Sequence, residues 1–107
     1  MQRYFIQLSY NGTAYHGWQI QENTFTTVQQ VLNEMLSRLL NEPVFITGCG
    51  RTDTGVHALE YFAHFDTSKN LLEDQTKWIF KFNNALPADI AIQKIISVAE
   101  KANARFD

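Results

Sequence analysis

VQQVLNEMLSRLL, residues 28–40, is the stretch of sequence that decides the fold. Its apolar side chains recur at alternating spacings of three and one, so they form one stripe along a helix: Val28, Val31, Leu32, Met35, Leu36, Leu39 and Leu40. A stripe of this kind normally faces the core of a globular protein. The spacing therefore predicts a core helix and gives no reason to expect a partner-binding face.

Both ends of this helix have signals of their own. Thr26 with Gln29, or Thr27 with Gln30, fits a capping box at the start. Pro43 disfavours the helical conformation at the residue before it, so we expect the helix to end there.

The rest of the chain reads as four strands and a second helix. The expected segments are the strands Arg3–Tyr10, Val44–Cys49, Val56–Asp66 and Ile90–Ala99 and the helix Leu72–Asn83. Alternation predicts that one face of the first strand carries Tyr4, Ile6, Leu8 and Tyr10, and that one face of the third carries Leu59, Tyr61, Ala63 and Phe65. On the second helix, the predicted buried side carries Trp78, Ile79 and Phe82.

The resulting order is strand, helix, strand, strand, helix, strand. Two interleaved, right-handed βαβ units with this order predict an α+β, ferredoxin-like split-βαβ fold, in which a four-stranded antiparallel sheet carries both helices on one face. The other sheet face is then left open. A bare face with aromatic residues is either a platform for nucleic acid or a surface that another domain covers.

Length and composition exclude several classes of protein. The chain has 107 residues, 45% of them hydrophobic and 19% charged, which fits one globular domain (1–107) and excludes a disordered tail. It has no apolar run near the ~18 residues of a membrane helix and no signal peptide, so we expect a cytoplasmic protein with no membrane partner. A net charge of −2 gives no overall field for nucleic acid.

The loop between residues 48 and 57 is the candidate site. Arg51 and Asp53 are two residues apart, so an extended backbone places both side chains on the same side of the chain. A neighbouring guanidinium favours the ionised carboxylate and so prepares a nucleophile or general base. The alternative, favoured by spacing alone, is a salt-bridged turn without chemistry.

Metal and thiol chemistry are not expected. His57 and His64 are an odd number of residues apart, so a regular strand sends them to opposite faces. His16 has no ligand near it in the sequence, and nothing local orients His57 toward Cys49. We expect Cys49, the only cysteine, to be a small buried residue.

The candidate loop resembles a known family signature. Gly50-Arg51-Thr52-Asp53-Thr54-Gly55-Val56-His57-Ala58 is similar to the G-R-T-D-x-G-V-H-A motif of the TruA family of tRNA pseudouridine synthases. Two further stretches agree with that family, YNGTAYHGWQIQ at 10–21 and NNALPADI at 83–90. The resemblance extends over essentially the whole chain.

The resemblance implies a function and a set of site residues. It makes Asp53 the nucleophile that attacks the target uridine in tRNA, and Arg51 the arginine that pairs with Asp53 and helps to hold the extruded nucleotide. Thr52, His57 and Gln19 match positions near the active cleft, as RNA- or substrate-binding residues without a defined role. It also implies a homodimer, a substrate in the anticodon stem-loop, and no metal or organic cofactor.

Two departures affect what the chain is expected to do. Asn11 stands where the family usually has Asp, and Asn103 stands where the family has His in a motif that opens the second half of the enzyme. The chain stops at Asp107, so the sequence is similar to the N-terminal half, and we expect its active cleft to be incomplete. The alternative is a non-catalytic RNA- or protein-binding module on the same scaffold.

Overall fold

A computed structural model describes residues 1–11, 27–49 and 58–98 of the chain. The elements follow the order β1 (Gln2–Tyr10), α1 (Val28–Leu40), β2 (Thr47–Gly48), β3 (Ala58–Thr67), α2 (Gln75–Ala85) and β4 (Ile90–Val98). The strands form one sheet in the order β2-β3-β1-β4, and all neighbouring strands are antiparallel. The structure confirms the α+β fold and the element order predicted from the sequence.

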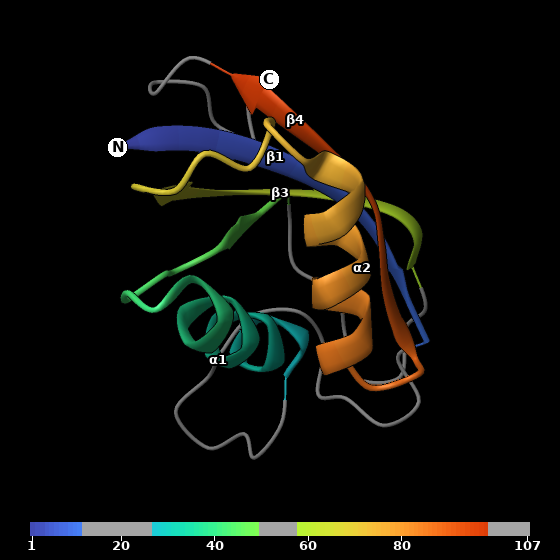
Figure 1. Ribbon diagram of the computed structural model, residues 1–107. Helices are drawn as coiled ribbons and strands as arrows, with labels where there is room; N and C mark the ends of the chain where they lie inside the picture. Colours follow the sequence, from blue (N-terminus) through green and yellow to red (C-terminus); the bar gives the residue numbers. More distant parts are fainter. Residues whose placement is uncertain (12–26, 50–57, 99–107) are drawn as a thin grey trace.

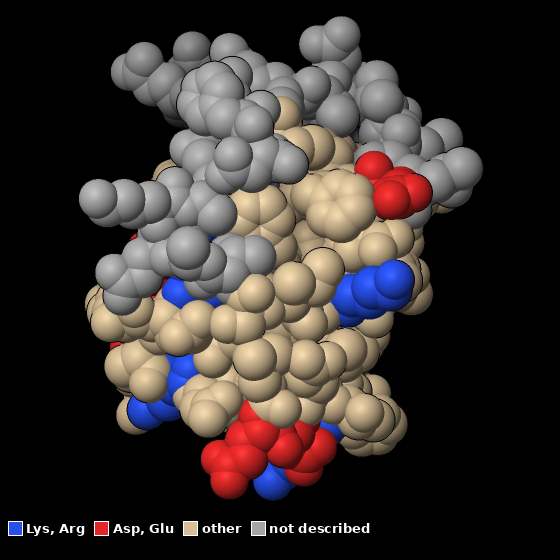
Figure 2. Space-filling model, turned by 90° about the horizontal axis from the view of Figure 1, so that it is seen from above, with Lys and Arg blue, Asp and Glu red and all other residues tan. Residues whose placement is uncertain are grey.

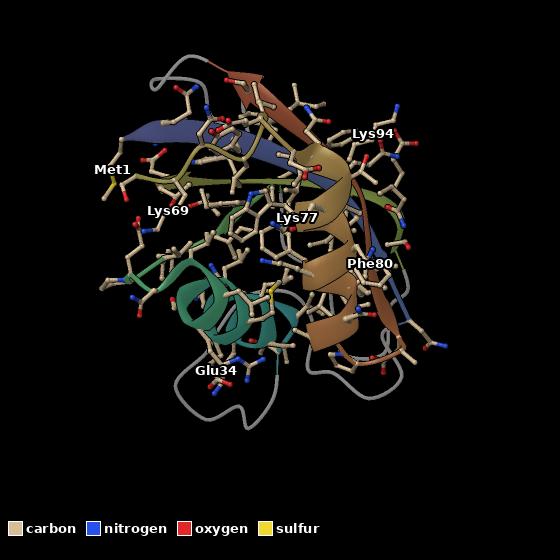
Figure 3. The ribbon with its side chains drawn as sticks, in the orientation of Figure 1. Met1, Glu34, Lys69, Lys77, Phe80 and Lys94 are labelled. Carbon is tan, nitrogen blue, oxygen red and sulfur yellow. The ribbon has the colours of Figure 1, made fainter. Side chains whose placement is uncertain are left out.

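The core lies between one face of the sheet and the two helices, which cover the same face (Figure 1). The residues that alternation placed together on one face of β1 point into this core and are at most 4% exposed, and Tyr61, Ala63 and Phe65 of β3 are at most 5% exposed. Of the predicted buried side of α2, Phe82 is fully buried and Trp78 and Ile79 are partly buried against the core. Phe80 of α2 projects away from the core and is 66% exposed (Figure 3).

Helix α1 begins where the second candidate capping box predicts. The side chain of Thr27 accepts a hydrogen bond from the Gln30 backbone N–H (3.2 Å), which satisfies one of the free donors of the first turn. The helix ends at Leu40, before the position where Pro43 alone would stop it. Asn41 causes this earlier end, because it adopts the left-handed conformation (φ 55°) that asparagine tolerates.

The strand expected over Val44–Cys49 is much shorter than predicted, since only Thr47 and Gly48 pair with β3. Side chains of α1 take the backbone bonds of the preceding residues. Ser37 bonds both backbone groups of Val44, Asn33 accepts from the Ile46 N–H, and Gln29 donates to the Ile46 carbonyl. Side chains of a helix, and not a neighbouring strand, therefore bond the backbone of Val44 and Ile46.

Helix α2 starts three residues later than predicted, at Gln75. Asp74 is its N-cap and accepts from the Lys77 N–H. The Asn70 side chain accepts from the N–H groups of Leu72 and Glu73, so these residues form a turn before the helix. The helix ends at Ala85, two residues past the predicted end, and Leu86 is its C-cap.

No helix in the described part of the chain is long and apolar enough to cross a membrane.

Candidate active site

Three segments that carry the sequence motifs meet at one end of the sheet. β1 ends at Tyr10, β3 begins at Ala58, and these two residues face each other in the antiparallel register. β4 begins at Ile90, which faces Tyr10 from the other side. Figure 1 shows the end of β1 and the starts of β3 and β4 together. Tyr10, where one motif begins, and Ala58, where another ends, therefore lie side by side in the sheet, although 48 positions separate them in the sequence.

The five predicted site residues lie outside the described residues. They are Gln19, Arg51, Thr52, Asp53 and His57. The structure places the ends of the two segments that hold them. The chain leaves β2 at Cys49, whose N–H donates to the Phe62 carbonyl (2.9 Å), and it returns at Ala58.

The sheet is irregular at this end. The β1–β3 register shifts between Leu8 and Tyr10, and the β1–β4 register shifts between Gln7 and Leu8. Such bulges bend and twist a strand and are common next to active sites, because they redirect side chains. The end of the sheet at which the candidate loop begins and ends is thus the end with altered strand geometry.

A pair of tyrosines supports this end from the core side. The rings of Tyr10 and Tyr61 pack edge to face with centroids 5.8 Å apart, and the two residues are 4% and 5% exposed. Edge-to-face pairs stabilise a fold by roughly 0.5–1.5 kcal/mol beyond the area they bury. The pair fixes the last residue of β1 against β3, close to the first residue after the candidate loop.

The segment that carries the motif NNALPADI, residues 83–90, is bonded to the same end of the sheet through its backbone. The N–H of Asn11 donates to the carbonyl of Asp89 (2.9 Å), just before β4 begins. Asn83, the first residue of that motif, bonds both backbone groups of Ile92. Asn83 had no predicted role, and its place at the head of the motif NNALPADI was its only signal in the sequence.

The sheet face opposite the helices carries a row of apolar and aromatic side chains. Phe5 of β1 faces His64 of β3 and Ile96 of β4, and its ring stacks on the His64 imidazole (centroids 5.6 Å apart, planes at 23°). Ile96 is 42% exposed, and Phe5 is partly buried. Of the described elements, both helices lie on the other face.

Two titratable groups on this face have lowered pKa values. Burial lowers the pKa of His64, and the nearby charge of Arg3 lowers it further against the opposing effect of Asp66. Hydrogen bonds from the Arg3 guanidinium lower the pKa of Asp66. The Arg3 Nε donates to Oδ1 of Asp66 (2.8 Å), and the Arg3 Nη2 donates to Oδ2 (3.1 Å). Neutral His64 and ionised Asp66 are therefore the forms that the folded state favours.

These shifts predict that acid destabilises the fold. Because both pKa values are lower in the folded state, the unfolded chain takes up each proton at a higher pH than the folded chain does. The free energy of unfolding therefore decreases as the pH falls below about 6.5 for His64, and below about 4 for Asp66. We expect Asp66→Asn to lower the urea midpoint at pH 7, and the difference from wild type to shrink below about pH 4. Glu34→Gln, at an exposed glutamate of α1, is the control and should leave the midpoint nearly unchanged. A constant difference at all pH values would contradict the assignment.

The described surface in view shows no broad basic patch. In Figure 2, acidic side chains gather at the bottom of the view with basic atoms beside them, other charged side chains lie near the rim, and uncharged residues occupy the middle. This agrees with the net charge of −2. Binding of a polyanion would depend on local contacts.

Neither a metal site nor a buried thiol is found among the described residues. No group of three or more His, Cys, Asp or Glu side chains in residues 1–11, 27–49 and 58–98 could hold a metal ion. The prediction for Cys49 is wrong, because this residue is exposed. It directly follows the two-residue strand β2, and its N–H still donates to the Phe62 carbonyl of β3.

Comparison with known proteins agrees with the three motifs. The family model described as tRNA pseudouridine synthase matches residues 7–107. Among curated relatives, the tRNA pseudouridine synthase A of Parabacteroides distasonis is 50% identical over all 107 residues, which is 42% of that protein. That of Azobacteroides pseudotrichonymphae is 52% identical, again over 42% of its length, and one from Acinetobacter baumannii is 42% identical over 99% of this chain and 39% of its own.

The chain therefore spans about two fifths of the length of the curated relatives it matches. The match covers all three motifs, at 10–21, 50–58 and 83–90. On this evidence the chain belongs to the tRNA pseudouridine synthase family.

Proposed function

We propose that this chain supplies the catalytic loop of an enzyme that isomerises uridine to pseudouridine in tRNA, in the anticodon stem-loop. The observation that carries the proposal is the nine-residue motif at 50–58 in a chain that the family model matches from residue 7 to its last residue. The meeting of the motif-bearing segments at one end of the sheet supports it, because residues from separate segments must converge to form a site.

Asp53 is the proposed nucleophile. Its carboxylate attacks the uridine, at the base or at the ribose, and the bond that this attack forms breaks again before the product leaves, which restores the free carboxylate. The bond between ribose C1′ and uracil N1 then breaks, and a bond between C1′ and C5 forms. N1 gains a proton and C5 releases one, so the product is an isomer of the substrate. No electrons enter or leave, and the proposed reaction uses no metal or organic cofactor.

Arg51 has two proposed tasks. Its guanidinium favours the ionised form of a nearby carboxylate, and its planar surface can occupy the space that an extruded base leaves in the RNA stack. Thr52, His57 and Gln19 are proposed to contact the RNA or the target nucleotide.

We expect Arg51→Lys in the full-length enzyme to lower kcat/KM for tRNA by roughly 10²-fold, because lysine keeps the charge but loses the planar fork. The measurement is pseudouridine formation under single-turnover conditions. Arg38→Lys, the same change at an exposed residue of α1, is the control and should have wild-type rates. Wild-type turnover of Arg51→Lys would mean that positive charge alone is sufficient.

The site is proposed to be incomplete in this chain. The remaining part of a full-length protein would supply the opposite wall of the cleft and more of the RNA-binding surface, and the full-length protein would act as a cytoplasmic homodimer. The relatives, of which this chain covers about two fifths, are the support for this part of the proposal.

A tritium-release assay tests the function. The full-length protein is incubated with tRNA that carries tritium at C5 of its uridines, and pseudouridine formation releases that tritium to solvent. The rival is a non-catalytic RNA- or protein-binding module. Tritium release from the anticodon stem-loop supports the enzyme, and tRNA binding without any release supports the module.

A further inference from the structure

Asn83 makes an unusual contact for a residue near the end of a helix. Its Nδ2 donates to the Ile92 carbonyl (2.9 Å), and its Oδ1 accepts from the Ile92 N–H (2.8 Å). β4 is an edge strand of the sheet, and an edge strand has backbone groups on its outer side that no other strand pairs with. The amide of Asn83 bonds Ile92 as a neighbouring strand would, and so joins the end of α2 to β4.

The turn between Asn83 and Ile92 is short, and hydrogen bonds order it. The Leu86 N–H donates to the Phe82 carbonyl (3.0 Å) at the end of α2, and the Ile90 N–H donates to the Pro87 carbonyl (3.1 Å). Leu86 is 7% exposed. With the helix and the strand joined by Asn83, the turn has a fixed place at the sheet end.

This turn holds the exit of β1. Asp89 presents its carbonyl to the Asn11 N–H at 2.9 Å, and Ile90 faces Tyr10 across the sheet. Asn11 is the first residue after β1 and the second residue of the motif that carries Gln19. Hydrogen bonds therefore lead from Asn83 through the turn to the start of that motif.

We propose that Asn83 is a positioning residue for the isomerisation. By joining α2 to β4 it fixes the Asp89 carbonyl, which in turn holds Asn11 at the end of β1, beside the point at Ala58 where the chain returns from the catalytic loop. The inference rests on the proposed function. It assigns to Asn83 a part in the geometry of the site without contact with the RNA.

Amide hydrogen exchange and kinetics of the full-length protein test this together. Asn83→Ala removes both bonds to Ile92. Asn83→Asp keeps the shape and the acceptor but loses the donor, and it serves if the alanine variant does not fold. Asn84→Ala is the matched control, because Asn84 is the adjacent asparagine and is exposed.

We expect exchange at the Asn11 amide to accelerate at least tenfold in the Asn83 variants, while exchange at Ile6 in the middle of β1 stays unchanged. We expect kcat of folded protein to fall about tenfold and KM for tRNA to change less than about twofold, since small displacements of positioning groups reduce turnover strongly. Asn84→Ala should match wild type in exchange at Asn11, in exchange at Ile6, in kcat and in KM.

Unchanged exchange at Asn11 would overturn the proposed linkage, and accelerated exchange with wild-type kcat would overturn the positioning role. A purely structural role would accelerate exchange at Asn11 and Ile6 alike, and that result also contradicts the proposal. A wild-type protein that forms no pseudouridine would refute the proposed function instead, and exchange at Asn11 would still decide whether Asn83 fixes the turn.

Discussion

Asp53→Asn in the full-length enzyme is expected to lower pseudouridine formation by at least roughly 10³-fold, because asparagine is nearly the same size but cannot act as the anionic nucleophile. The Kd for tRNA should stay within about twofold of wild type, since the target nucleotide is held mainly by other groups. The rate is measured by single-turnover tritium release, and Kd by filter binding at a fixed salt concentration.

The control for this prediction removes one carboxylate charge elsewhere. Glu34→Gln makes the same chemical change at an exposed position of α1, and it should leave both rate and Kd at wild-type values. Residual turnover of Asp53→Asn near the wild-type rate would remove Asp53 from the mechanism. A loss of tRNA binding that matches the loss of rate would make Asp53 a binding residue.

The 107-residue chain by itself is expected to fold but to form no detectable pseudouridine. Folding is expected because one continuous core joins both helices to the sheet, with Leu36 and Phe82 among its fully buried residues. Inactivity is expected because positioning of the reacting groups contributes roughly 7–11 kcal/mol to catalysis, and much of the positioning surface is proposed to lie outside this chain. A net charge of −2 gives tRNA little electrostatic attraction.

The same chain is also expected to self-associate through the sheet face opposite the helices, where Phe5 and the 42% exposed Ile96 lie side by side. Circular dichroism of the purified chain checks that it folds, tritium release checks that it is inactive, and light scattering checks that it self-associates. Turnover at full-length rates would contradict the incomplete-site account, and a strict monomer at high concentration would contradict self-association. Phe5→Ser should reduce the association, whereas Phe80→Ser on the helix side should not.

Periodicity predicted the elements whose structure depends on nearby residues. The stripe of α1, the Thr27 cap and the alternation of β1 follow from local spacing, and the structure confirms them. The helix boundaries that were predicted wrongly depend on single polar residues at the helix ends. Asn41 ends α1 early, and Asp74 sets the start of α2, because Asn and Asp side chains at helix ends override the apolar pattern.

Contacts between distant segments could not be predicted from periodicity. The Val44–Ile46 segment looked like a strand, yet Asn33 and Ser37 of α1 take its backbone bonds, and only packing shows which partner is nearer. The joining of Asn83 to Ile92 is similar, since its residues are nine positions apart on different elements. The proposed roles of the site residues came from the motif alone and stay predictions.

The central claim is that Asp53 belongs to an enzyme that rearranges uridine in tRNA, and mass spectrometry of the product tests it most directly. The full-length protein is incubated with an anticodon stem-loop whose uridines carry deuterium at C5. The RNA is then digested to nucleosides, which are separated, and their masses are measured. The account predicts pseudouridine that has lost its deuterium to solvent, and none with Asp53→Asn. If every uridine of the stem-loop keeps its deuterium and no pseudouridine forms after prolonged incubation with wild-type protein, the account is contradicted.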